Sequence, residues 1–182
     1  MDKKDLILME DRLKTIYVNK NILFFDGNID SDTIFKAMSL IQKNPKVDRI
    51  HLTTYGGSVE QGLKFISFIR SLGRNIDIKV VGYCMSIGTA ILSAATGKKI
   101  MGKYSFLMYH DISSHPWDTT TSGLRNIVKN HEFLDTITYS LINPTNDKKI
   151  KNFLDMVYNS GKDINVNSTE ALDIGLVDVL ED

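Results

Sequence analysis

The sequence predicts an α/β fold, and three observations lead to that prediction. Short runs rich in β-branched residues alternate with longer segments whose apolar residues recur every three or four positions, a pattern typical of strands followed by amphipathic helices. Strand-then-helix order repeated along a chain predicts parallel strands joined by right-handed crossovers. No repeat, low-complexity tract or linker interrupts this order, so residues 1–182 are predicted to form a single domain.

The first half of the chain contains three strand–helix units. The predicted strands are 21–25, 50–53 and 76–81, and the helices that follow them are 31–44, 59–73 and 86–97. Ser31 is expected to cap the first helix, and Gly56-Gly57 to form the turn before the second. Residues 1–20 have no clean apolar period, so no structure is predicted for this N-terminal segment.

The second half begins with a short apolar strand, 106–109, and a polar loop, 111–121. A long amphipathic helix, 122–142, follows the loop. Its stripe of near-heptad spacing consists of Leu124, Ile127, His131, Leu134, Thr138 and Leu141. From the pattern alone, this stripe indicates a helix that packs against the core. Two more helices are predicted at 149–158 and 169–174, the second capped by Ser168.

The composition of the chain argues against a nucleic-acid-binding, membrane-spanning or disulfide-stabilised protein. The 22 basic and 22 acidic residues cancel, so nothing favours nucleic acid or an anionic membrane as a partner. A single cysteine cannot form an internal disulfide, and no apolar run is long enough for a signal sequence or a membrane span. We therefore expect a cytoplasmic protein that needs no metal or cofactor.

Ser86 stands where a predicted strand turns into a helix. At a helix N-terminus, unpaired backbone N–H groups and the helix dipole favour developing negative charge. A serine there is usually only a cap, and a nucleophilic serine needs a base. Four histidines are available: 51, 110, 115 and 131. His110 lies where a strand ends and a loop begins, a place where catalytic groups concentrate. Cys84 is a rival nucleophile, but its small and apolar neighbours indicate packing.

Five segments of the chain resemble the Clp protease proteolytic subunit, in that family's order and with its spacing. They are Tyr55–Val59, Gly82–Gly88, Gly97–Lys99, Leu107–His110 and Ser168–Asp178. The likeness extends from about residue 21 to residue 178, which is most of the chain. It implies the crotonase-like α/β fold of that family. It also implies that residues 111–142 form a loop and a projecting handle helix rather than a core-facing one.

The resemblance also assigns a site. It implies Ser86 as nucleophile, His110 as base and Asp163 as the group that orients the base, with Asp111 as a rival for this last role. The oxyanion donors would come from Gly56, Gly57 and Ile87, and the substrate would lie against Ser58, Val59, Asp111 and Ile112. The chain has Thr54-Tyr55 where the family usually has Ser-Pro, a departure that bears on the rigidity of the glycine loop and leaves the exact oxyanion donor open. It has Asp111-Ile112 where the family usually has Gln-Pro, so the family's cleft specificity is not carried over.

By the same resemblance, the chain would be a serine endopeptidase that cleaves unfolded polypeptides inside two stacked seven-membered rings. An AAA+ unfoldase would feed these rings. The chain has no Gly-x-x-x-x-Gly-Lys-Ser/Thr loop, so any ATP use belongs to that partner. Two alternatives remain: a catalytically inactive ring subunit or scaffold, and an acyl-CoA hydratase or isomerase of the same fold.

Overall fold

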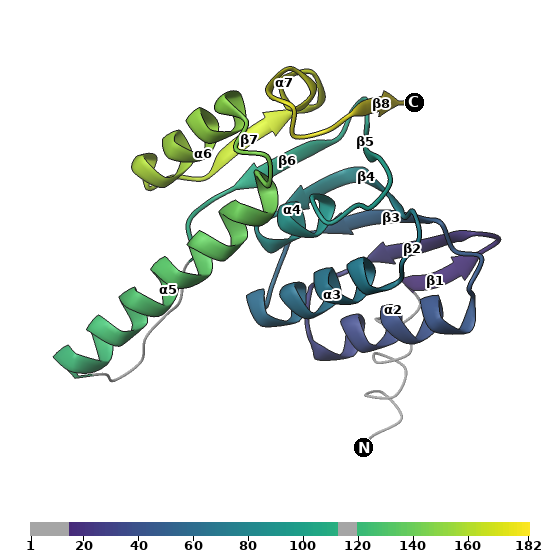
Figure 1. Ribbon diagram of the computed structural model, residues 1–182, viewed down its shortest axis with the longest axis horizontal. Coiled ribbons are helices and arrows are strands. Elements are labelled where there is room, and N and C mark those ends of the chain that lie inside the picture. Colours follow the sequence, from purple (N-terminus) through teal and green to yellow (C-terminus); the bar gives the residue numbers. More distant parts are fainter. Residues whose placement is uncertain (1–14, 113–119) are drawn as a thin grey trace, which may run out of the picture.

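The computed structural model describes residues 15–112 and 120–182, and their strands form one eight-stranded sheet (Figure 1). The strands are β1 (Ile16–Asn19), β2 (Ile22–Asp26), β3 (Arg49–Thr54), β4 (Asp77–Met85), β5 (Lys99–Gly102), β6 (Phe106–Tyr109), β7 (Ile164–Asn167) and β8 (Val179–Glu181). The helices are α2 (Ser31–Lys43), α3 (Val59–Ser71), α4 (Ile87–Leu92), α5 (Thr121–Ile142), α6 (Lys148–Ser160) and α7 (Ser168–Ile174). The α/β prediction is confirmed.

The sheet is mostly parallel, as the strand–helix order predicts. Its main path runs β1-β2-β3-β4-β5-β8, and β6 pairs with both β4 and β7. The β1–β2 and β6–β7 pairs are antiparallel. The strands that the sequence pattern missed are β1, β5, β7 and β8, and each has at most four residues. Runs this short carry little periodicity, and the neighbouring strand supplies their stability.

Strand β4 pairs with two different strands along its length, and this pairing positions Ser86 and His110. Its first half, Ile78–Val80, pairs with β5, and its second half, Tyr83–Met85, pairs with β6. Both pairings are parallel, so β4 and β6 end at the same edge of the sheet. Ser86 follows β4 and His110 follows β6, and the topology therefore places these two residues at one edge.

Local caps correct two predictions. Helix α2 is capped by Asp30, whose carboxylate accepts the N–H groups of Asp32 and Thr33 at 3.0 and 2.9 Å, so the Ser31 assignment is wrong. Asn167 rather than Ser168 caps α7. In addition, α4 ends at Leu92 and does not continue to residue 97.

Helix α5 projects from the body of the molecule, while α2 and α3 lie against the sheet (Figure 1). Its buried residues are Asp135, Thr138 and Ile142, all in its C-terminal half. Three apolar side chains on it are exposed: Leu124, Val128 and Phe133. The prediction of a core-facing helix therefore holds for the C-terminal half of α5 only. Its N-terminal half projects, as the prediction of a handle helix has it.

None of the described helices is both long and apolar enough to span a membrane. His115, residues 1–14 and most of the predicted loop after His110 lie outside the described residues.

Candidate active site

Ser86 adopts a backbone conformation that is costly for a residue with a side chain. Its φ is +54° and its ψ is −131°, and it separates the end of β4 from the start of α4. Its N–H donates to the carbonyl of Met108 on β6 at 2.9 Å. Its carbonyl accepts the N–H and the hydroxyl of Thr89 at 2.9 and 2.8 Å. These bonds hold a tight strand-to-helix turn, the geometry that presents nucleophilic serines in hydrolases.

The hydroxyl of Ser86 remains available because it makes no capping hydrogen bond to α4. The backbone, not the side chain, therefore maintains the turn. This arrangement differs from the capping role that a serine at this position usually has.

The Gly56-Gly57 loop passes directly beside this serine. A Cβ on Gly56 would lie 2.7 Å from Cβ of Ser86, and one on Gly57 would collide with the carbonyl oxygen of Ile29. Both glycines have positive φ values, 95° and 144°. The N–H of Gly56 donates to Oγ1 of Thr54 at 3.0 Å. Among the described residues no acceptor is recorded for the N–H of Gly57. The loop therefore approaches the serine at Gly56, and within the described residues the N–H of Gly57 makes no hydrogen bond.

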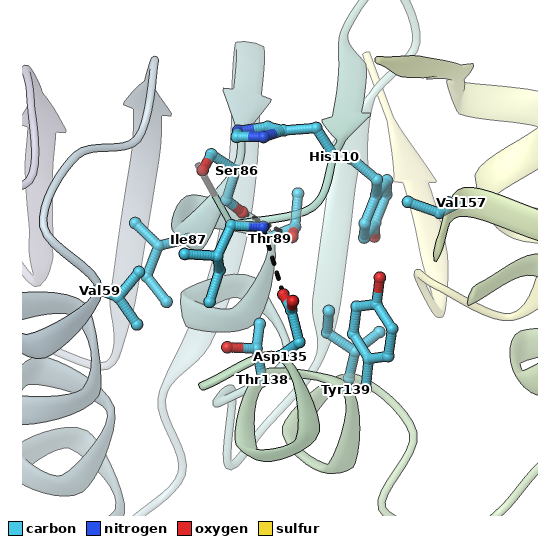
Figure 2. A pocket seen from close by; sticks show the side chains of 12 residues that line it. Val59, Ser86, Ile87, Thr89, His110, Asp135, Thr138, Tyr139 and Val157 are labelled. Atoms are coloured by element: carbon cyan, nitrogen blue, oxygen red, sulfur yellow. Dashed lines mark hydrogen bonds between the residues drawn. The ribbon is translucent and has the colours of Figure 1, made fainter. Parts of the chain in front are cut away.

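Ser86 and His110 line the same cavity (Figure 2). The apolar walls of this cavity come from four helices and from the segment after β6, and they are Val59, Ile87, Ile112, Ile142 and Val157. Figure 2 shows the side chains of Ser86 and His110 at one end of the cavity, and Asp135 with Thr138 at the other.

His110 has a defined tautomer in this arrangement. Its Nδ1 lies 2.5 Å from the carbonyl oxygen of Asp111. A carbonyl can only accept a hydrogen bond, so Nδ1 carries a proton, and in the neutral imidazole Nε2 is then the acceptor. An imidazole with an unprotonated Nε2 is the form that removes a proton from a serine hydroxyl.

Asp163 lies close to His110 in the sheet register but not in the cavity. Strand β7 runs antiparallel to β6 and pairs Ile164 with Tyr109, so 110 and 163 are the next facing positions. The side chain of Asp163 is exposed, and no hydrogen bond joins it to His110 in the described structure. Asp163 therefore lies opposite His110 in the β6–β7 register, but no hydrogen bond joins the two residues in the described structure.

The cavity also contains a carboxylate that the sequence reasoning missed. Asp135 of α5 is only 7% exposed and accepts the N–H of Ile112 at 3.3 Å. One turn further along α5, the hydroxyl of Tyr139 donates to Asp111 at 3.2 Å. The signal was the 135/138/139 spacing, which places three polar side chains on the buried face of an amphipathic helix.

Burial raises the pKa of Asp135 above the ordinary value of an aspartate. The hydrogen bond from Ile112 opposes this effect, the nearby Asp111 adds to it, and His131 and His110 oppose it. Burial also raises the pKa of the Tyr139 phenol. This end of the cavity is therefore poorly solvated.

A model of the Clp protease family matches residues 8–182. The chain belongs to the Clp protease family. The resemblance expected from five short segments is thus confirmed, and the mixed α/β fold with its long helix α5 fits the fold of that family.

Two curated Clp proteins are similar to this chain. The ATP-dependent Clp protease proteolytic subunit 2 of Chlamydia pneumoniae is 26% identical over 147 residues, which is 80% of this chain and 70% of that protein. The protein of the same name from Chlamydia abortus is 32% identical over 82 residues, which is 44% of this chain and 40% of that protein. Family membership is therefore clear and the similarity is distant.

The other candidates of this Clp-family chain have structural roles or lie outside the cavity. Cys84 is fully buried, and burial raises the pKa of its thiol, which keeps it unreactive. Ser58, expected to meet substrate, caps α3 by accepting the N–H of Gln61 at 3.3 Å. The His51 ring packs edge-on against Phe24, with 5.0 Å between the ring centroids, and burial lowers the pKa of His51. In the described part of the chain, no cluster of side chains could hold a metal ion.

Proposed function

We propose that this chain is a serine endopeptidase, the proteolytic subunit of an ATP-dependent Clp protease. Ser86 attacks the peptide carbonyl, and Nε2 of His110 takes its proton and later delivers it to the leaving amine. The observation that carries the proposal is the strained turn at Ser86, whose uncapped hydroxyl shares a cavity with a His110 ring protonated on Nδ1.

The oxyanion formed in this reaction needs two backbone donors. We assign them to the N–H groups of Gly57 and Ile87. Ile87 begins α4, where N–H groups have no partner within the helix. The N–H of Gly56 already donates to Thr54, so Gly56 serves instead to let the loop approach Ser86. Each such donor typically lowers the barrier by about 3–4 kcal/mol.

Asp163 is proposed to orient His110. The β6–β7 register supports this role because it sets the two residues at facing positions. Its rival Asp111 is engaged elsewhere, since its carboxylate accepts the hydroxyl of Tyr139. Movement of the segment before β7 toward His110 would let the Asp163 carboxylate replace the Asp111 carbonyl at Nδ1.

Assembly is the second part of the proposal. We infer that residues 1–182 form one peptidase domain and that copies of it assemble into two stacked seven-membered rings in the cytoplasm. The exposed apolar residues of α5 (Leu124, Val128 and Phe133) would lie between the rings. Polypeptides would be the substrates, and an AAA+ unfoldase would be the partner that uses ATP.

A second candidate is a ring subunit without catalytic activity. The observation that favours it is the exposed position of Asp163, since no carboxylate within residues 15–112 and 120–182 forms a hydrogen bond with His110. This candidate shares the fold and the assembly with the first. The two differ only in whether Ser86 reacts.

Covalent labelling separates the two candidates. A fluorophosphonate should label the assembled wild-type protein and the Cys84→Ser variant, while Ser86→Ala should remain unlabelled. Cys84→Ser is the matched control because it alters a side chain on the preceding strand, two residues away. An unlabelled wild type would support the inactive subunit, and label retained in Ser86→Ala would show that Ser86 is not the nucleophile.

A further inference from the structure

The pairing of β3 with β4 is interrupted just before the two strands reach the site. Leu52 pairs with Val80 in regular register. Thr54, two residues further along β3, pairs with Cys84, four residues further along β4, so β4 has two extra residues at this point. This β-bulge contains Gly82, whose φ is +81°. Regular strand pairing therefore does not set the distance between the loop that follows β3 and the serine that follows β4.

Two hydroxyl side chains hold the bulge in one conformation. The hydroxyl of Thr53 on β3 donates to the carbonyl of Val81 at 2.6 Å. On the other side, the hydroxyl of the buried Ser105 accepts the N–H of Gly82 at 3.0 Å. Bulges next to active sites commonly redirect a side chain. Here the side chain that follows the bulge is that of Tyr83.

Tyr55 contacts Tyr83 across this interruption. The two ring centroids are 4.4 Å apart, with 35° between the ring planes. On its other side, Tyr83 lies near the ring of Phe106, with 6.2 Å between the centroids. Tyr55 directly precedes Gly56, and Tyr83 is three residues before Ser86 on the same strand. The ring contact therefore connects the Gly56-Gly57 loop to the strand that carries the serine.

The other restraints on this loop do not involve β4. The N–H of Ile29 donates to the carbonyl of Gly56, and the carbonyl of Ile29 accepts the N–H of Ser58, both at 2.8 Å. The hydroxyl of the buried Thr54 accepts the N–H of Gly56 at 3.0 Å. Tyr55 has the next side chain along the strand and is 62% exposed. Consecutive glycines have unusual backbone freedom, so a restraint from the exposed side matters as well.

We propose that Tyr55 and Tyr83 are positioning residues of the peptidase reaction, because their contact sets the Gly56-Gly57 loop relative to Ser86. Oxyanion donors are effective when they are in place before charge develops, since no reorganisation is then needed. Tyr55 stands where the family usually has a proline, a residue that restricts the backbone by its own ring. The ring contact with Tyr83 would supply this restraint here. The inference deepens the proposed function and rests on it.

The test measures hydrolysis of a short peptide by Tyr55→Leu, Tyr83→Leu and the double variant. Each single change should lower kcat by about 10-fold and leave KM nearly unchanged, because the affected donor acts in the transition state. The double variant should lose no more than either single variant, since each removes the same contact. Tyr55→Phe keeps the ring and should retain more of the kcat than Tyr55→Leu. Tyr104→Leu, at a tyrosine that is 91% exposed, is the control and should keep the wild-type kcat.

Hydrogen exchange gives a second readout that does not depend on turnover. The segment 55–59 should exchange faster in Tyr83→Leu, because the bonded N–H groups of Gly56 and Ser58 would open more often.

A raised KM with unchanged kcat would overturn the inference and make Tyr55 a substrate contact. Additive losses in the double variant, or faster exchange with a wild-type kcat, would overturn it as well. A wild type that neither cleaves peptides nor labels at Ser86 would refute the proposed function and the positioning role with it. That result differs from an active enzyme whose kcat is insensitive to Tyr55 and Tyr83, which refutes the inference alone.

Discussion

The two helices beside the cavity, α4 and α5, are held in opposite ways. All six residues of α4 are buried, and the turn that precedes it is fixed by backbone hydrogen bonds to β6 and to Thr89. Helix α5 has 22 residues, of which three are buried. Four of its side chains line the cavity, and two of them, Asp135 and Tyr139, form hydrogen bonds with Ile112 and Asp111.

This difference divides the site into a core half and a peripheral half. The core half, with Ser86 and the glycine loop, is part of the packed interior and is formed within a single chain. The peripheral half, with residues 110–112, depends on where α5 lies. Because most of α5 projects from the body, a partner that covers it would influence the base more than the nucleophile.

The largest effect should come from Asp163, which is proposed to orient His110 of the peripheral half. Asp163→Ala should lower peptide turnover by about 10³–10⁴-fold because an imidazole without its carboxylate loses the correct orientation. Particle mass, measured by light scattering, should not change. Asp173→Ala, another exposed aspartate near the C-terminus, is the control. Near-normal turnover in Asp163→Ala together with an inactive Asp111→Ala would transfer the orienting role to Asp111.

In the core half, Gly57→Ala should reduce kcat by about 10²–10³-fold. The added methyl would collide with the Ile29 carbonyl and shift the N–H proposed as an oxyanion donor. Gly73→Ala is the matched control, since Gly73 also has a positive φ, 64°, but has open space around it. Equal losses of kcat in both variants would mean that general backbone strain, rather than donor position, explains the effect.

Charges on α5 should disrupt assembly while the core remains folded. Ile127→Glu combined with Leu134→Glu should give smaller folded species with at least about 10-fold lower peptidase activity, because an interface cannot bury unpaired carboxylates cheaply. Lys129→Glu alters charge on an exposed position of the same helix and should assemble normally. Size-exclusion chromatography with light scattering, run beside a peptide assay, measures both. Full mass and activity in the double variant would show that this face of α5 meets solvent.

The smallest effect concerns stability at Asp135. Burial raises the pKa of this carboxyl in the folded state, so ionisation above that pKa disfavours folding. Asp135→Asn should therefore be more stable than wild type near neutral pH, by a change on the order of 1 kcal/mol. The gain should vanish as the pH falls below the ordinary aspartate range, where both states hold the proton. Urea unfolding at several pH values gives the comparison, and a gain that persists in acid would contradict it.

Apolar spacing and short motifs are enough to predict the elements with long, clear periodicity and the family. Helices α2, α3, α5 and α6 and the central strands follow from apolar spacing, because a buried face leaves a repeat that survives without any knowledge of partners. Ser86 and His110 could be chosen because each stands at the end of a strand in a family motif. The family could also be predicted, because short motifs in a fixed order and spacing are local features of the chain.

Which groups lie opposite these residues depends on how distant parts of the chain pack together. Strand β4 pairs with β5 in its first half and with β6 in its second half, so the ends of β4 and β6 lie at one edge of the sheet. This pairing cannot be predicted from the local sequence. Asp135 is one polar residue among many on an amphipathic helix until the fold buries it in the cavity. The physical reason is that periodicity records which face of an element is buried, whereas a site depends on which faces meet, and that is set by long-range packing.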